Sequence, residues 1–525
     1  MKRVITIVSV LIFGVLLCVA QNIQQQRQQQ MQQEQQAVEL QEMQLRQAIE
    51  QQRQDDALQE QQRQREVQLQ NLMVSNESEL RQAVAQAENT PAVVKLTRDI
   101  ELISNFSIPS GANITLTSIG ATMFSLISTR DMDVITVQEN ARLTIENIRI
   151  TRRAGTKGRG IINRRNSFLT MNNGLISGHS GDPNASLGTV YLGDVFGGGI
   201  DNFGTFVMNG GIISGNSPRD NTWCAGGVTC YGSFTMNGGT IGNNENGAIS
   251  YSGNFILNGG TINGRVFNPG WARGRNATFA MNGGTINGDV SHSRIENNSF
   301  IINDGIIRGN VSSGNIIMRS GAIYGNVTFN SSNRNFIMHN GIINGGVVIG
   351  SGTFTMNDGI IRGSNGNGVS MGTGITTITF IMNGGIISGH RGVGVSNDGR
   401  WNSIFTMNGG TIAYNGGGGV SNNGRDSFFT MNNGVIHSNT TQGGVSTSRT
   451  FIMKGGMIYN NTTNASGGGV NHTGGTFTFD GGWIFNNRAA SGSDISIGQT
   501  GTFNNNVLDS NIGAIGTPPP NFRQQ

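Results

Sequence analysis

The sequence predicts an all-β fold, a right-handed parallel β-helix of about 14–17 coils. The first observation is composition: the 525 residues include 80 glycines and only 8 prolines, which suits many tight turns between short strands. The second is a repeated phrase, FTMNGGTI, which occurs at 234–241 and again at 405–412. The third is the spacing of its variants, mostly 18 to 28 residues, which is typical of a solenoid with one repeat per turn.

Each position of the phrase has a structural interpretation. Fourteen copies fit the form F-x-M-N-x-G-x-I, and the sixth position is Gly and the eighth Ile in all of them. Phe and Met lie two residues apart, so they point to the same face of a strand. Asn followed by Gly predicts a bend, because Asn tolerates and Gly accepts a positive φ. A Gly-aliphatic pair follows the Ile at about five to ten residues, as at 394–395 and 419–420, and predicts a third strand.

A unit this short cannot bury a core alone, but stacked units can. We therefore expect Phe to lie over Phe, Met over Met and Ile over Ile, about 4.8 Å apart along the stack. The Asn side chains are expected to form a hydrogen-bonded ladder at the bend. Variable repeat length disfavours a left-handed hexapeptide helix, which leaves the right-handed form.

The first 92 residues differ in composition from the rest of the chain. Residues 1–20 resemble a secretory signal peptide, with Lys2 and Arg3 before an apolar run that ends at Ala20. Residues 21–75 are Gln-rich and are expected to form a solvated helical spacer; a short coiled coil for self-association is the alternative. A helix at 76–92 is expected to cap the first coil, because Asn76 and Glu79 suit a capping box.

The repeat domain is expected to span 93–510, and the tail 511–525 is expected to be disordered. Two cysteines, Cys224 and Cys230, remain after removal of a signal peptide. They are six residues apart, so they can form a disulfide only if the chain turns between them. A disulfide and two thiols therefore stay open as alternatives.

The pattern resembles that of secreted bacterial repeat proteins with a pectin-lyase-like parallel β-helix, many of them adhesin-like surface proteins. The resemblance rests on the FTMNGGTI copies, the Gly-Val elements, the lead-in VVKLTRDIELISNFSIPSGANITLTS and the closing GGWIFNNRAASGSDISI, and it covers about residues 76–510. It implies the fold more than an activity, because this fold carries both polysaccharide-cleaving enzymes and non-catalytic binders.

No catalytic residue, metal site or cofactor is predicted. Within the phrase, carboxylates at the fifth position occur only as Asp304 and Asp358, three coils or about 14 Å apart, whereas a glycosidase pair needs roughly 5–9.5 Å. Arg308 and Arg362 follow in the same coils. The six histidines are interpreted as exposed turn residues, and the basic stretch 152–165 as a solvated turn.

The insertions that interrupt the repeat are the predicted places for binding, because loops on a rigid scaffold carry function. They lie at 178–199, in the following coil, and at 266–276. Aromatic and basic side chains there suit contact with glycans or acidic polymers. The candidate binding residues are Tyr191, Trp223, Trp271, Arg273 and Arg275.

These features predict an exported protein, secreted or held at the cell envelope, that acts as a non-enzymatic surface, adhesin-like or structural binding module. The alternative is a polysaccharide lyase or glycoside hydrolase. Expected partners are glycans or surface components of a host or neighbouring cell, with self-association through 21–75. Nucleic acid is not an expected partner, because the net charge of +4 is spread along the chain.

Overall fold

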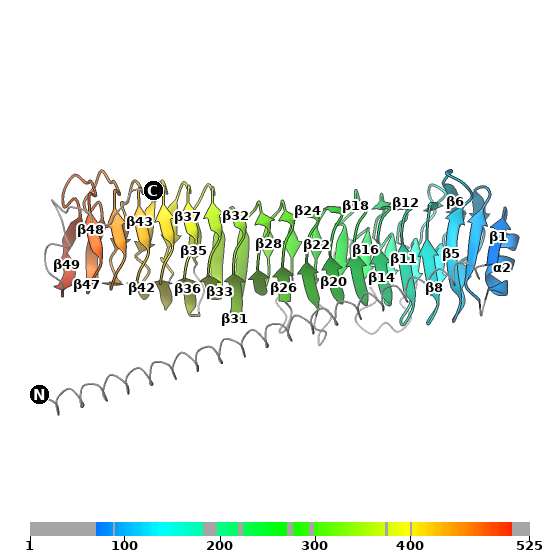
Figure 1. Cartoon of the computed structure of the whole chain (residues 1–525), viewed down its shortest axis with the longest axis horizontal. Coiled ribbons are helices and arrows are strands. Elements are labelled where there is room, and N and C mark those ends of the chain that lie inside the picture. Colours follow the sequence, from blue (N-terminus) through cyan, green and yellow to red (C-terminus); the bar gives the residue numbers. More distant parts are fainter. Residues whose placement is uncertain are drawn as a thin grey trace, which may run out of the picture. The chain divides into compact units, whose positions relative to one another are not determined.

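The computed structural model describes residues 70–87, 90–181, 197–218, 224–269, 277–292, 299–372, 376–399 and 402–506. The signal peptide, the spacer up to residue 69 and the tail 511–525 lie outside these ranges and stay predictions. The described residues form an all-β parallel solenoid of about 16 turns (Figure 1). The predicted all-β parallel β-solenoid is confirmed.

Each turn contributes up to three short strands, and every strand pairs in parallel with its counterpart in the next turn. The strands of the Gly-aliphatic element form one ladder, which we call the valine face. Those carrying Phe and Met form the phenylalanine face, and those carrying the Ile form the isoleucine face. Four long strands run through both of the first two faces.

The valine face consists of β4 (Phe106–Ile108), β7 (Ile135–Val137), β10 (Ile161–Asn163), β13 (Ile200–Asn202), β16 (Val228–Cys230), β19 (Ile249–Tyr251), β22 (Val266–Phe267), β25 (Val290–Ser291), β28 (Val311–Ser312), β35 (Val369–Met371), β38 (Val393–Ser396), β41 (Gly418–Asn422) and β44 (Val445–Thr447). The long shared strands are β31 (Val327–Met338), β33 (Val347–Met356), β47 (Val470–Phe479) and β49 (Ile495–Asn505).

The phenylalanine face consists of β1 (Gln70–Val74), β2 (Ala92–Leu96), β5 (Asn113–Ser118), β8 (Arg142–Ile145), β11 (Phe168–Met171), β14 (Thr205–Met208), β17 (Ser233–Met236), β20 (Asn254–Leu257), β23 (Thr278–Met281), β26 (Ser299–Ile302), β29 (Asn315–Met318), β36 (Ile378–Met382), β39 (Ser403–Met407), β42 (Ser427–Met431) and β45 (Thr450–Met453).

The isoleucine face consists of β3 (Ile100–Leu102), β6 (Phe124–Ser128), β9 (Ile148–Arg152), β12 (Leu175–Ser177), β15 (Ile212–Ser214), β18 (Thr240–Gly242), β21 (Thr261–Asn263), β24 (Thr285–Asn287), β27 (Ile306–Ile307), β30 (Ala322–Ile323), β32 (Ile342–Asn344), β34 (Ile360–Arg362), β37 (Ile386–Ser388), β40 (Thr411–Ala413), β43 (Val435–His437), β46 (Met457–Tyr459) and β48 (Trp483–Phe485).

The core is a set of columns that run along the stack, as the repeat predicts. The ring of Phe405 stacks on Phe380 at a centroid distance of 4.9 Å and on Phe429 at 4.7 Å. These spacings match the distance between neighbouring strands. The Met and Ile positions are buried in the same way, from Met171 to Met453 and from Ile176 to Ile484. Burial of large apolar side chains in every turn stabilises the stack.

The predicted asparagine ladder is confirmed at the corner between the phenylalanine and isoleucine faces. Each Asn amide donates to the carboxamide oxygen of the Asn one turn earlier, over 2.6–2.8 Å. The ladder runs from Asn172 to Asn303 and again from Asn357 to Asn432, and it is exposed to solvent. We call this edge the asparagine corner.

The glycine at the sixth position has a positive φ in all fourteen copies, as in Gly410 at 84°. A Cβ on Gly410 would lie 2.6 Å from Met382 Cε and 2.7 Å from the Gly385 carbonyl oxygen. Gly389 shares the positive φ, at 69°, but a Cβ there meets no atom within 4 Å. The asparagine corner therefore needs glycine for both backbone and packing, whereas the corner after the isoleucine face, where Gly389 lies, favours glycine for its backbone alone.

We expect Gly410→Ala to lower the free energy of unfolding by about 2–4 kcal/mol, because left-handed strain and overpacking add. Gly389→Ala is the control and should cost only about 1–2 kcal/mol from the backbone alone. Denaturant unfolding followed by circular dichroism measures both. Equal losses would show that the close approach of the turns contributes nothing.

The N-terminal end begins earlier than the sequence analysis placed it. Residues 70–74, assigned there to the spacer, form β1, which pairs with β2. The reason is that Leu72 and Val74 alternate toward the core, a pattern that the Gln-rich surroundings obscure. Helix α2 (Glu77–Gln86) follows and contacts β1, β2 and β3 (Figure 1).

Local interactions explain where α2 begins. The Asn76 side chain accepts a hydrogen bond from the Glu79 amide at 3.0 Å, and the Glu79 carboxylate accepts one from the Ser75 amide at 2.6 Å. These bonds satisfy amide groups that a helix start leaves open. Leu80 and Val84 are buried on its inner side. In the described ranges, no helix has both the length and the apolar character needed to cross a membrane.

Candidate functional site

The predicted binding residues cannot be placed. Tyr191, Trp223, Trp271, Arg273 and Arg275 lie outside the described residues, so their role stays a prediction.

The two cysteines are described. Cys224 and Cys230 are both buried and both present as thiols. Burial raises the pKa of the Cys230 thiol to about 12, and its sulfur donates a hydrogen bond of 3.5 Å to the Gly232 carbonyl. A thiol with so high a pKa is a poor nucleophile, because the thiolate is the reactive form.

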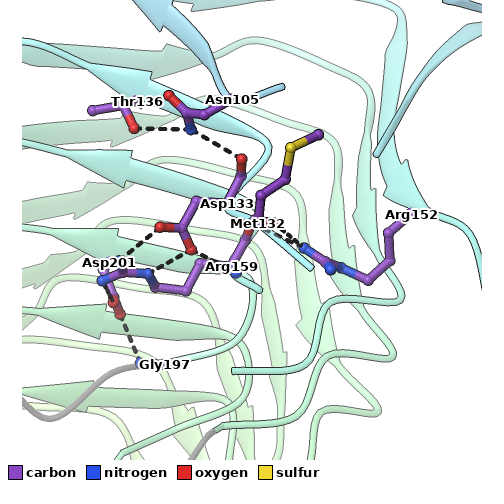
Figure 2. Close-up of polar contacts among 8 residues, drawn as sticks. All are labelled: Asn105, Met132, Asp133, Thr136, Arg152, Arg159, Gly197 and Asp201. Carbon is purple, nitrogen blue, oxygen red and sulfur yellow. Dashed lines mark hydrogen bonds and ion pairs between the residues drawn. The ribbon is translucent and has the colours of Figure 1, made fainter. Parts of the chain in front are cut away.

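A charged cluster lies at the start of the valine face (Figure 2). Asp133 precedes β7, Arg159 precedes β10 and Asp201 lies in β13, and these three strands pair in successive turns. The Arg159 guanidinium donates to both carboxylate oxygens of Asp133 at 2.8 Å and to Asp201 at 3.1 Å. Gly197, where the described chain resumes, donates its amide to Asp201 at 2.8 Å.

A second cation lies behind this triad. Arg152, at the end of β9, donates to the Met132 carbonyl at 2.9 Å and to His179 Nδ1 at 3.3 Å. His179 Nε2 lies 3.0 Å from the Ile150 carbonyl, so the neutral ring with its proton on Nε2 satisfies both contacts. Arg152 Nη1 is buried without a hydrogen-bond partner among the described residues.

Burial and charge set the pKa values of the cluster. Burial raises the pKa of Asp201 to about 6, although the Arg159 charge and the Gly197 amide act against it. Burial would also raise the pKa of Asp133, but the hydrogen bonds and charge of Arg159 hold it below its usual value. Burial and the Arg152 charge lower the pKa of His179 to about 3. Burial lowers the pKa of Arg152 to about 10.

Two carboxylates with pKa values pushed apart are a known arrangement for acid–base chemistry. Here, however, the Asp201 side chain is fully buried and the Asp133 side chain is 25% exposed. The Arg159 guanidinium donates hydrogen bonds to both carboxylates, and the Gly197 amide donates a further one to Asp201. The geometry therefore suits a structural clamp between successive turns better than a pair of carboxylates that meets a polymer.

Two expectations from the sequence are wrong. The stretch 152–165 is not a wholly solvated turn, because Arg152 is buried and the Arg159 side chain is only 15% exposed. The histidines are not generally exposed: four of the six are buried, namely His179, His292, His390 and His472.

The burial of two of these histidines has a simple cause. His179 and His390 occupy the inward corner position that Asn fills in the following turns, and the amide of each donates to the next Asn, at 3.1 Å to Asn216 and 3.2 Å to Asn415. They therefore belong to a second, internal asparagine ladder. Burial lowers the pKa of His390, which keeps its ring neutral at pH 7.

The aspartates at the fifth position act locally. Asp304 accepts a hydrogen bond from the Gly305 amide at 2.8 Å, and Asp358 accepts one from the Gly359 amide at 2.7 Å. Arg362 donates to Asn344 at 2.7 Å, and Arg308 lies over the Tyr324 ring at 5.6 Å. The two carboxylates are three turns apart, as predicted, and each stabilises its own corner.

A shallow groove of about 640 Å³ runs along the isoleucine side of the asparagine corner. The sixth position of the repeat is glycine in each turn that the groove crosses, so no side chain projects from it beside the outward residues of the isoleucine face. Its lining crosses four successive turns: Gly283, Gly284, Thr285, Asp304, Gly305, Ile306, Ser320, Gly321, Ala322, Asn340, Gly341 and Ile342.

No group of three or more His, Cys, Asp or Glu side chains within the described ranges has the arrangement of a metal site. Comparison with known protein families, with curated proteins and with solved structures finds no match for the chain.

Proposed function

We propose that the chain is an exported, non-enzymatic β-solenoid that binds glycans or other cell-surface components as an adhesin-like module. The groove along the asparagine corner is the observation that carries this proposal. Glycine backbone recurs in every turn of the groove, and the fifth position adds a carboxylate, a hydroxyl and an amide in three successive turns, at Asp304, Ser320 and Asn340. An extended polymer has a matching one-dimensional repeat, so a groove of this kind favours a chain-like ligand.

Two features of the sequence support export and attachment. Lys2, Arg3 and the apolar run up to Ala20 suit a secretory signal, and the Gln-rich residues up to 69 suit a spacer between the solenoid and the cell envelope. Self-association through this spacer is part of the proposal. No cofactor and no nucleic acid is required.

The alternative, a polysaccharide lyase or glycoside hydrolase, is favoured by one observation, the opposite pKa shifts of Asp133 and Asp201. Against it, a polymer could reach Asp201 only if the clamp opened, because the carboxylate is fully buried. We therefore rank binding above cleavage.

The test uses the mature chain, residues 21–525, and gels that contain one polysaccharide each, neutral or acidic. Binding retards the protein, and the same mixtures are assayed for new reducing ends and for unsaturated uronate absorbance. We expect retardation without new chain ends. Cleavage with a defined product, or free migration in every gel, would refute the proposal.

A pair of variants locates the contact. Ala322→Arg places a long side chain in the groove, whereas Ala280→Arg places the same side chain on the outward row of the phenylalanine face. We expect retardation to be lost in Ala322→Arg and retained in Ala280→Arg. Equal effects would remove the groove as the binding site.

A further inference from the structure

Four aromatic rings form a row along the C-terminal turns of the isoleucine face. Tyr414 follows β40, and His437, Tyr459 and Phe485 end β43, β46 and β48. The Tyr414 and His437 centroids are 5.2 Å apart with the rings nearly perpendicular. His437 stacks on Tyr459 at 5.1 Å, and Tyr459 stacks on Phe485 at 5.3 Å. We call these residues the aromatic row.

Tyr414 is the unusual member, because its backbone has a φ of 58°. The same corner carries glycine in other turns, such as Gly215 and Gly389, or a small polar residue, such as Ser438 and Asn460. A bulky residue in the left-handed region is strained and needs a compensating gain. Packing does not supply that gain, since Tyr414 is 64% exposed.

The exposure of the row changes along its length. Phe485 is buried, Tyr459 and His437 are half-buried and Tyr414 is exposed. Stacking on the buried end holds the middle rings in place, so the exposed end is pre-oriented without the entropy cost of ordering it on binding. The row thus resembles the rigid aromatic part of a ligand site, to which a few polar groups add orientation.

Two uncharged polar side chains adjoin the middle of the row. The Ser438 hydroxyl lies 3.0 Å from His437 Nδ1, and Asn460 follows Tyr459 at the next corner. Burial lowers the pKa of His437, so its ring is neutral at pH 7. A flat apolar ring surface with hydroxyl and amide groups at its edge fits a sugar ring, which has an apolar C–H face and a hydroxyl rim.

We propose that the aromatic row binds a neutral, β-linked hexopyranose polymer, with one sugar ring lying on Tyr414. This inference rests on the proposed binding function and assigns it a second contact, on the same face as the groove. In a β-linked glucopyranose all ring substituents are equatorial and both faces are flat, so such a polymer can lie along the stacked turns.

Tyr414→Gly tests the site without harming the fold, since glycine relieves the left-handed strain. In gels with hydroxyethyl-cellulose we expect the apparent Kd to rise about tenfold, as for an anchor residue. The thermal midpoint should be unchanged or higher. Binding within about twofold of the natural chain would overturn the proposal, and so would tighter binding of polygalacturonate than of hydroxyethyl-cellulose.

Two controls separate the ring from its surroundings. Asn243→Gly makes the same backbone change at the equivalent corner of a distant turn without removing a ring, and Tyr324→Ala removes a 49% exposed tyrosine from the same face outside the row. Both should bind within about twofold of the natural chain. If Ala322→Arg abolishes binding while Tyr414→Gly does not, the aromatic row is refuted and the proposed function stands. If the natural chain binds no polysaccharide, both are refuted.

Discussion

Replacement of Phe429 by Ala is expected to lower the free energy of unfolding by about 3–5 kcal/mol, the usual loss for a large aromatic removed from a core. Phe429 is fully buried in β42, and its ring stacks at 4.7 Å on both Phe405 and Phe451. Truncation leaves a cavity in the column, and the neighbouring turns cannot close it without breaking their own strand pairing. Urea unfolding followed by circular dichroism measures the loss.

The adjacent residue provides a matched control. Phe428 lies in the same strand but points outward and is 44% exposed. Phe428→Ala should cost less than about 1 kcal/mol, since little apolar surface returns to water. Equal losses in the two variants would mean that the inward and outward sides of β42 are wrongly assigned.

Replacement of Arg159 by Leu is expected to cost about 3–5 kcal/mol at pH 8, because it leaves the buried Asp201 without its cation. The loss should shrink toward pH 5. The folded-state pKa of Asp201 is already raised to about 6, and removing the cation raises it further. A carboxyl whose pKa is higher in the folded than in the unfolded state contributes its full stability at pH values below the unfolded-state pKa. This contribution is lost as the pH rises through the folded-state pKa.

The control is the exposed pair Arg153–Glu101, at 2.8 Å with both side chains more than half exposed. Arg153→Leu should change stability by less than about 1 kcal/mol, without a similar pH dependence. Thermal unfolding from pH 5 to 8 compares the two variants. A pH-independent loss in Arg159→Leu would contradict the burial of an ionisable Asp201.

The columns and the asparagine ladder were predictable because the same residue types recur at the same place in every turn. The contact between Phe380 and Phe405 could be predicted without knowledge of other long-range contacts, since each residue lies beside the equivalent residue of the next turn. The charged cluster was not predictable in this way. Each of its members occurs only once: Asp133 lies 26 residues before Arg159, and Asp201 lies 42 residues after it. Only the register of β7, β10 and β13 brings them together.

A weaker signal for the cluster was present. Asp133 stands before Val134 and Ile135, Arg159 before Gly160 and Ile161, and Asp201 directly after Gly199 and Ile200, so alignment of these elements would have placed the three near each other. Tyr414 had a signal of the same kind, because it replaces a glycine or small polar residue two positions after the repeat Ile. The histidines were misjudged because polar character suggested exposure, whereas their position in the turn points inward.

Removal of one whole turn tests the central claim most directly, namely that the repeated phrase builds an interchangeable unit of the stack. Met338 and Met356 occupy equivalent positions in neighbouring turns, so deletion of 339–356 joins Met338 to Asn357 in register. The deletion variant should unfold within about 5 °C of the natural chain, because each turn contacts mainly its neighbours. A variant lacking only 348–356 should not fold. Unfolding of the whole-turn deletion, or a stable fold of the half-turn deletion, would contradict the claim.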